Sequence, residues 1–481
     1  MKIQPEMGNK FSLLAILFVL MLSTAQAQTG NQERTLTLEQ AIELALANNP
    51  QVNRAILAVE DADQLVKIAN GEVYPDIVSS INYTRNIEIP VQFVPGEFFG
   101  GAPGTLVPIS FGTDNNWQGG FTVSQNIFKG EALVALKSSA VFKEVQKENL
   151  RATSQQIITQ TRIAYYGVLA AKEQLRLQNA QIRRLETSLR ETEARAKAGI
   201  VDDYSVLRIQ VQLNNQKPQQ IEAEYAVAEA YRNLNIAIGL PINFPVEVQG
   251  SLSAYDILSD SATDPSNAHL KKVDRMNEYN YSSSVIDSAG LTELRGDIRI
   301  IDANLNLKEK EILAVKSRFL PTITASYNLQ WSAAEPEEPT FFENASRFQT
   351  LGVNVSLPLF QGFKRVANLD RAKIQYKDIE EQKRMAIMNA QNEVASAGEE
   401  LNKIYETASA RKQALEQAQE GYTRAKKRLE NGLGSQLELT EAEVQVREAE
   451  VNYALMVFNY LSAKANYDLS IGKVPFIDTT D

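Results

Sequence analysis

Two carboxylates, Glu438 and Glu441, lie three residues apart and therefore share one face of a helix predicted to begin after Gly432 and Gly434. Carboxylates held together can bind cations, and when crowded they take up protons more readily. Acidic side chains near a helix N-terminus are also favoured by the helix dipole alone and are then simply solvated. The two residues by themselves leave both interpretations open.

A similar glycine turn lies in the first half of the chain, where Asp202 and Asp203 follow Gly199. The positions that match Glu438 and Glu441 are occupied there by Ser205 and Arg208, so the acidic pair of this turn lies nearer the glycine. Apolar residues form the tips of both turns: Ile200 and Val201 in the first, Leu433 in the second. Such tips either pack locally or bind a partner, and the sequence favours neither.

The chain offers little for enzymatic chemistry. It has one histidine, His269, and no cysteine among 481 residues, so no Ser/His/Asp arrangement and no metal cluster has plausible spacing. It has no Gly-x-x-x-x-Gly-Lys phosphate loop, and a net charge of −10 gives no electrostatic case for nucleic-acid binding. We therefore predict no enzyme, no cofactor and no metal, and any step that needs energy would depend on a partner.

The N-terminus has the pattern of an export signal. Lys2 and Lys10 supply positive charge, 11–22 form a short apolar core, and Ala25-Gln26-Ala27 fits cleavage after about Ala27. The apolar run is shorter than the roughly 20 residues of a membrane-spanning helix, which argues against an anchor. No later segment is apolar enough to span as a helix, and with no cysteine after the signal a lipoprotein anchor is also excluded. Any membrane attachment must come from the fold.

Long helices dominate the predicted secondary structure. Uninterrupted helical patterns cover 130–198 and 363–431, and at about 1.5 Å per residue each is roughly 100 Å long. Each turns at its glycines and returns, the second as far as Ser470. A shorter helix is predicted from Thr37, its cap, to Gly71, and Pro218 is expected to kink or break the returning helix of the first half. Apolar residues seven apart in the long helices suit side-by-side coiled-coil packing.

Four segments alternate between apolar and polar residues, as strands with two different faces do. They cover 77–88, 117–128, 322–331 and 351–357, with a long loop predicted over 90–116. Each is close to the length needed to cross a bilayer when tilted. Trp117 and Trp331 lie at the loop ends of their strands, where membrane-interface aromatics are found. A water-soluble sandwich is the alternative, but four strands beside such long helices would make a poor one.

The chain is predicted to be a tandem duplication. The segment 120–130 matches 352–362 at an offset of 232, and Gly199 matches Gly432 and Ile238-Gly239 matches Ile471-Gly472 at an offset of 233. After the signal peptide (1–27), the body at 28–481 therefore contains repeat 1 (about 36–240), a polar linking segment (about 241–290) and repeat 2 (about 291–472).

These parts restrict the assembly. Four strands cannot close a barrel, and open strand edges cannot lie in lipid because their backbone groups would be unsatisfied. Several chains must therefore pool their strands, and three chains, with twelve strands, would be the smallest assembly with a wide aqueous lumen. Long hairpins below a polar-lined barrel would make a hollow conduit, although this reasoning does not fix the number three.

Several motifs together resemble the TolC-type outer-membrane efflux family: the start at 36–50, Leu320-Pro321 before a strand, 358–362 after one, and the Ile-Gly-Leu-Pro close of the first repeat. The resemblance covers nearly all of the mature chain. It implies a mixed, mainly α fold in which three chains form a 12-stranded outer-membrane β-barrel continuous with a periplasmic α-helical barrel. The linking segment would then lie in an equatorial belt.

The resemblance also implies a function: a passive exit duct in the outer membrane that serves a tripartite efflux or type I secretion system. The implied partners are two further copies of the chain, a periplasmic adaptor, an inner-membrane pump of RND or ABC type, and outer-membrane lipid. Glu438 and Glu441 would line the closed entrance, with Asp202, Asp203 and Ser205 in the first repeat. The glycines and apolar tips of the turns would contact the adaptor: Gly199, Ile200, Val201, Gly432, Leu433 and Gly434. Gly434 replaces a basic residue that latches the closed state in the family's prototype.

The main alternative is an exported coiled-coil scaffold or adhesin without a pore. A stand-alone porin would leave the long helices unexplained. The sequence does not name the cargo.

Overall fold

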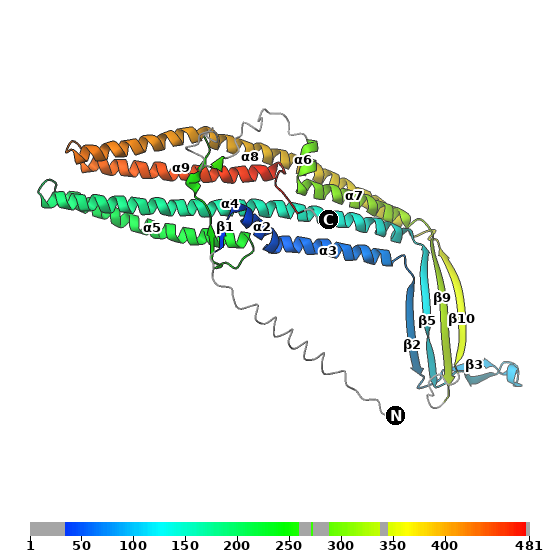
Figure 1. Cartoon of the computed structure of the whole chain (residues 1–481). Coiled ribbons are helices and arrows are strands. Elements are labelled where there is room, and N and C mark those ends of the chain that lie inside the picture. Colours follow the sequence, from blue (N-terminus) through cyan, green and yellow to red (C-terminus); the bar gives the residue numbers. More distant parts are fainter. Residues whose placement is uncertain (1–33, 259–270, 273–287, 337–344, 478–481) are drawn as a thin grey trace, which may run out of the picture. The chain divides into compact units, whose positions relative to one another are not determined.

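The computed structural model describes residues 34–258, 271–272, 288–336 and 345–477 (Figure 1). The export signal, His269 and most of the polar linking segment lie outside these residues. The described chain divides into two compact units. The helical unit comprises the described parts of 1–53, 153–287 and 392–477, and the strand unit those of 54–152 and 288–391.

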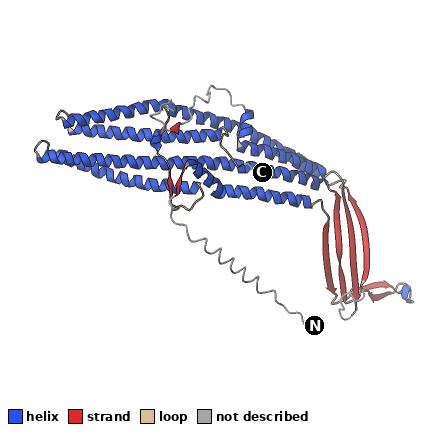
Figure 2. Cartoon of the chain, viewed as in Figure 1, coloured by secondary structure: helices blue, strands red, loops and turns tan. Residues whose placement is uncertain are grey.

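The strand unit is built on one four-stranded antiparallel sheet (Figure 2). Its strands are β2 (Asp76–Arg85), β5 (Asn115–Phe128), β9 (Thr322–Glu335) and β10 (Ser346–Ser356), in the order β10-β9-β5-β2. The four predicted strands are thus confirmed. The two edge strands, β2 and β10, are exposed along their whole length.

The two faces of this sheet differ sharply in polarity. Opposed residues share a face, and a row of hydrogen bonds crosses the polar one: Thr122 donates to Asn328 (2.8 Å) and Asn328 donates to Thr350 (3.3 Å). The opposite face is mainly apolar. Its residues include Ile77, Ile81, Tyr83, Trp117, Phe121, Val123, Ile323, Tyr327, Leu329, Trp331, Leu351, Val353 and Val355.

The two hairpins of the sheet have the same register. In the first, Ile81 pairs with Gly119; in the second, Tyr327 pairs with Leu351. These are equivalent positions when 74–75 is matched to 320–321 and 120–130 to 352–362. The strand pairing of one half therefore reproduces that of the other.

The predicted loop at 90–116 is wrong in part. It contains a small antiparallel hairpin of β3 (Val91–Pro95) and β4 (Leu106–Ser110), joined through the 3₁₀ helix η1 (Gly96–Phe99), and it also contains the start of β5. Figure 1 shows β3 beyond the end of the main sheet that lies away from the helices. The density of glycine and proline hid two short strands.

Two long helical hairpins make up most of the remaining chain (Figure 1). The first consists of α4 (Gly130–Lys197) and α5 (Asp203–Ala237), and the second of α8 (Lys364–Glu430) and α9 (Gln436–Ser470). α4 and α8 contribute residues to both units. The helix predictions are confirmed to within a residue or two, but α5 runs through Pro218 without the predicted break.

The first predicted helix is divided in two. α2 (Leu38–Asn48) begins with the expected capping box of Thr37 and Gln40, but it ends before Asn49, and α3 (Pro50–Gly71) starts afresh. Proline suits a first helical position because its missing N–H would have no intrahelical partner there. Asn49 fixes the joint by donating to the Ala237 carbonyl (2.8 Å) and accepting from the Gln51 amide (2.8 Å).

Short elements complete the two units. In the helical unit, β1 (Arg34–Leu36) pairs in parallel with β6 (Val246–Val248), followed by η2 (Leu252–Ala254) and by β7 (Tyr255–Asp256) paired with β8 (Lys271–Lys272). In the strand unit, α6 (Ser288–Leu294) and α7 (Gly296–Ser317) pack near α4. No helix among the described residues combines the length and apolar character needed to cross a bilayer.

Candidate entrance turns and membrane face

The turn between α4 and α5 has a simple backbone design. Gly199 has φ 70°, in the left-handed region that glycine adopts freely, and the Ile200 amide donates back to the Arg195 carbonyl (2.9 Å). Asp202 then caps α5, accepting from the Ser205 amide (3.1 Å) and hydroxyl (2.6 Å). These bonds hold the pKa of the Asp202 carboxyl below its usual value.

The turn between α8 and α9 repeats that design with other side chains. Gly432 has φ 72°, and the Leu433 amide donates to the Arg428 carbonyl (2.8 Å). Ser435 occupies the position of Asp202 and caps α9 by accepting from the Glu438 amide (3.2 Å). Each predicted turn is therefore a real turn.

The carboxylates predicted to line an entrance are exposed in the single chain. Asp203, Glu438 and Glu441 are all exposed, and Glu438 lies 3.6 Å from the guanidinium of Arg428. Arg428 therefore places a positive charge beside the carboxylate of Glu438 at this turn. A side chain at Gly434 would be crowded, because a Cβ there would lie 3.0 Å from Cβ of Arg428.

The apolar tips point into solvent. Ile200 is 71% exposed and its equivalent Leu433 is 73% exposed, whereas Val201 is half-buried. The structure adds Tyr204 and its equivalent Leu437, which sequence reasoning missed although both are exposed one turn further on. The signal was available as the matched spacing of large apolar residues in the two repeats.

Polar contacts tie the start of α9 to α4. Gln436 donates to the Ser188 hydroxyl (2.8 Å) and accepts from Thr192 (3.3 Å), and further along α9 Glu450 pairs with Arg184 (3.2 Å). Midway between Gln436 and Glu450 lies Glu443, which is only 2% exposed. Sequence analysis missed it, although it occupies the heptad position that Gln436 and Glu450 share.

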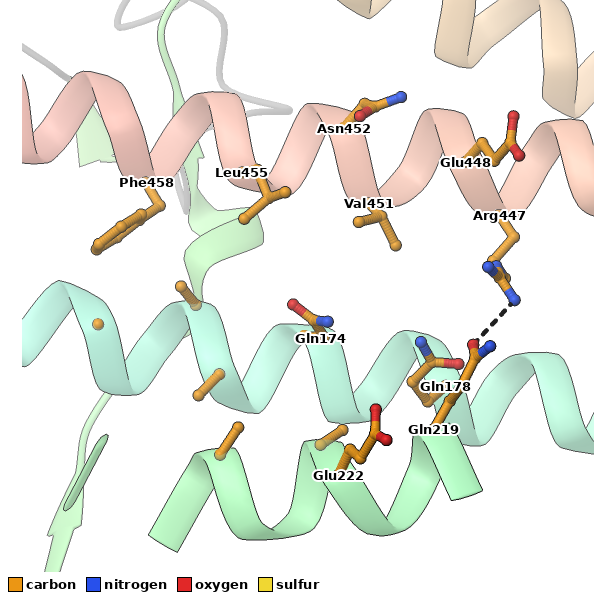
Figure 3. Close-up of a pocket in the computed structure, with 15 residues that line it drawn as sticks. Gln174, Gln178, Gln219, Glu222, Arg447, Glu448, Val451, Asn452, Leu455 and Phe458 are labelled. Carbon is orange, nitrogen blue, oxygen red and sulfur yellow. Dashed lines mark hydrogen bonds between the residues drawn. The ribbon is translucent and has the colours of Figure 1, made fainter. Parts of the chain in front are cut away.

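A groove of about 660 Å³ lies over α4, between α5 and α9 (Figure 3). Its floor is made of small residues, and Gln174 and Gln178 of α4 and Glu222 of α5 border it. Arg447 of α9 reaches across its end to Gln219 (3.3 Å). The opposite face of α4 contacts the short elements at 246–255, where Lys172 pairs with Glu247. One face of α4 therefore borders an open groove, and the opposite face is covered by the short elements at 246–255.

Trp117 and Trp331 both lie on the apolar face of the sheet. Trp117 is 8% exposed and stacks on Tyr83 (centroids 4.2 Å apart), while Trp331 packs edge-on against Phe121 (6.4 Å). Their role at a membrane interface stays a prediction.

A second aromatic group, which sequence analysis missed, lies where β10 leads into α8. Phe360 and Phe363 contact each other edge-on (5.5 Å) and are both about three-quarters exposed. Phe363 has φ 61°, an unusual conformation for a residue other than glycine, and it follows Gly362 at φ 59°. Exposed aromatic residues therefore also follow the end of β10 that leads to the helices.

Comparison with known proteins decides the family. The family model for outer membrane efflux proteins matches residues 41–240 and 291–473. The chain belongs to the outer membrane efflux protein family.

Curated relatives and solved structures agree with this assignment. The chain is 22% identical to the outer membrane protein TolC of Escherichia coli, over 94% of this chain and 86% of that protein. It is also 22% identical to the pyoverdine export outer membrane protein OpmQ of Pseudomonas aeruginosa, over 84% and 78%. The CmeC outer membrane channel of Campylobacter jejuni superposes with a TM-score of 0.71 at 18% identity, covering 92% of this chain and 87% of that one.

Family membership settles the general role. This outer membrane efflux protein is an exit duct located in the outer membrane, and the predicted TolC-type fold is confirmed. Members of the family are channels rather than enzymes. Among the described residues no group of acidic or histidine side chains could hold a metal ion.

Proposed function

We propose that three copies of this chain close a 12-stranded barrel, with the polar face of each sheet inward, and conduct cargo passively. The two open edges carry this proposal. β2 and β10 each pair with the sheet along one edge only, and their other edges present unpaired backbone groups. These edges border the apolar face of the sheet. Such edges are unstable in hydrocarbon unless another chain pairs with them.

The junction between the repeats supplies a template for the junction between chains. Within one chain β5 pairs with β9, so that Val123 opposes Tyr327. The repeat equivalents of these strands are β10 and β2, the two free edges. Copying the register predicts that Val355 of one chain opposes Ile81 of the next, and that Asn354 opposes Asn82 on the polar face.

Cysteine crosslinking tests this register on a clean background, because the chain has no cysteine of its own. Asn354→Cys combined with Asn82→Cys is expected to give covalent trimers on a denaturing gel. Directly opposed residues in an antiparallel pair lie about 5 Å apart between Cβ atoms, and diagonal ones about 7–8 Å. The matched control, Asn354→Cys with Ser80→Cys, is therefore expected to crosslink poorly. Equal crosslinking by both pairs, or none by either, would contradict the register.

The two turns form the closed periplasmic entrance in this proposal. Three chains would bring together six carboxylates from Glu438 and Glu441, with Asp202, Asp203 and Ser205 of the first repeat nearby. A ring of carboxylates favours cations. Glu438→Gln with Glu441→Gln is expected to lower the cation preference and change the conductance of the trimer in a planar bilayer; unchanged selectivity would count against the assignment.

The turns also bind a periplasmic adaptor, which links the duct to an inner-membrane pump that supplies the energy. The exposure of Ile200 and Leu433, with glycines behind them, supports this role. Charge reversal at Asp202 and Asp203 is expected to reduce adaptor capture in a pull-down, with charge reversal at Glu222, away from the turns, as the control. A pore-less scaffold would show neither bilayer conductance nor adaptor capture that depends on the turns.

A further inference from the structure

Glu443 lies in a polar cavity of about 300 Å³ between α4, α8 and α9. The residue is 2% exposed, and its Oε2 atom accepts no hydrogen bond from any residue that the structure describes. A buried ionised carboxylate normally needs a full set of hydrogen bonds or a close positive partner.

Charged groups approach Glu443 from each helix that packs against it. α4 contributes Arg183, Arg184 and Glu191 to the cavity, and α8 contributes Tyr422 and Lys426. Arg184 is already engaged with Glu450 (3.2 Å) and Gln181 (3.1 Å), and Lys426 is exposed. The cavity therefore provides positive charge without direct contact to the carboxylate.

Glu443 lies between the two contacts that hold the start of α9 against α4. It lies two turns from Gln436, which is bonded to α4, and two turns from Glu450, which is paired with Arg184. Glu441, a proposed entrance residue, is two residues away. A change in the protonation of Glu443 therefore affects the packing of the stretch of α9 that positions the second turn.

The first repeat lacks this feature. The residue equivalent to Glu443 is Gln210, which cannot ionise and is exposed on α5. A requirement of the hairpin fold itself would have placed the same kind of group in both repeats.

We propose that Glu443 is a proton-binding site: the protonated carboxyl keeps α9 packed on α4 and α8, and ionisation loosens the second turn. The protonated acid removes the need for a counter-charge and can donate a hydrogen bond within the polar cavity. The carboxylate instead favours a state in which α9 separates enough to admit water. The entrance in the second repeat is thus coupled to the pH of the surrounding solution.

Burial raises the pKa of the Glu443 carboxyl from its ordinary 4.5 to about 7, against the opposing charges of Arg184 and Lys426. The packed state binds the proton more tightly than an opened, hydrated state. Its stabilisation by the proton is complete below about pH 4.5 and is lost as the pH rises through about 7. This loss of stability therefore falls within the pH range that a compartment in contact with the cell exterior can reach.

Native-state hydrogen exchange of the purified full-length trimer tests the proposal. If the opened state has an ordinary carboxyl, the linkage relation predicts that opening of 436–446 increases roughly 25-fold between pH 5.5 and pH 8, after correction for intrinsic exchange. The equivalent stretch of α5, 203–213, is expected to change much less.

Two variants isolate the proton. Glu443→Gln keeps the shape without the charge and is expected to stay packed at both pH values. Gln210→Glu puts a carboxyl at the equivalent exposed position and is expected to add no pH dependence. An unchanged pH step in Glu443→Gln, or no step in the wild-type protein, overturns the proposal.

Bilayer conductance gives the second readout and rests on the proposed entrance. Wild-type conductance is expected to rise between pH 5.5 and pH 8, and this rise is expected to disappear in Glu443→Gln and to persist in the Glu438→Gln/Glu441→Gln variant. If exchange shows the step and conductance does not, the proton site stands and the proposed entrance fails.

Discussion

The two turns share a backbone and differ in nearly every side chain around it. Gly199 and Gly432 adopt the same left-handed conformation, and Asp202 and Ser435 cap the following helices at equivalent positions. Yet the first turn closes its carboxylate on Ser205, whereas the second sets Glu438 against Arg428 and buries Glu443. The two matched segments thus share the backbone of the turn and carry different side-chain chemistry.

The largest difference is expected in how firmly the two returning helices are held. Leu439 is 4% exposed, whereas its equivalent Val206 is half-buried. Leu439→Ala is expected to lower the free energy of local opening of α9 by about 3 kcal/mol, through lost burial and a residual cavity. Val206→Ala is expected to lower that of α5 by about 1 kcal/mol. Hydrogen exchange measures both; equal losses would show that the two repeats are held alike.

Substituting the turn glycines tests the shared part of the comparison. Gly199→Ala and Gly432→Ala are each expected to cost about 1–2 kcal/mol, because the left-handed conformation strains any residue with a Cβ. Beyond the glycine and its two chain neighbours, no atom lies within 4 Å of the added Cβ at either position, so the two costs are expected to be equal. Gly421→Ala, within α8, is the control and is expected to stabilise by about 0.5–1 kcal/mol. Unequal costs at the two turns, measured by thermal unfolding of the trimer, would contradict the shared design.

The two caps are expected to differ in their pH dependence. Ser435→Ala is expected to cost about 1 kcal/mol at every pH, since a hydroxyl cap does not titrate. Asp202 has a lowered pKa, so its contribution is complete above the ordinary value of 3.8 and is lost as the pH falls through its folded value. Helix opening at pH 7 and pH 3, measured in Asp202→Ala and Ser435→Ala, checks this. An Asp202→Ala effect that is the same at both pH values would contradict it.

Features that leave a local or periodic pattern in the sequence, such as strands and glycine turns, could be predicted from it. Alternation identified all four strands of the sheet, and the glycines at 199 and 432 marked both turns, because these signals are local. The break at Asn49 and the hairpin at 91–110 were missed for the same reason: Pro50 starts a helix as readily as it ends one, and glycine and proline fit both loops and strand edges.

Burial at the site was harder to predict than the turns themselves. Glu443 belongs to a heptad series with Gln436 and Glu450, yet only the packing of α4 and α8 shows which member is enclosed. Pro218 illustrates the converse case. α5 continues as a helix where local propensity predicts a break, and it buries residues on both sides of Pro218, Leu213 and Ala223 among them.

The smallest expected effect on stability concerns the arginines behind the turns. Arg428 and its equivalent Arg195 occupy the same position, but among the described residues Arg428 has a carboxylate nearby, Glu438 at 3.6 Å, and Arg195 forms no ion pair. Because both side chains of that pair are about half exposed, Arg428→Ala is expected to cost below about 0.5 kcal/mol. Its consequence is electrostatic: freeing Glu438 adds uncompensated negative charge at the proposed entrance and is expected to raise cation preference in bilayer recordings. Arg195→Ala is expected to leave a smaller change, because Ser205 stands at the position equivalent to Glu438 and carries no charge. If both variants shifted selectivity equally, the arginines would act through net charge alone and the pairing with Glu438 would have no special role.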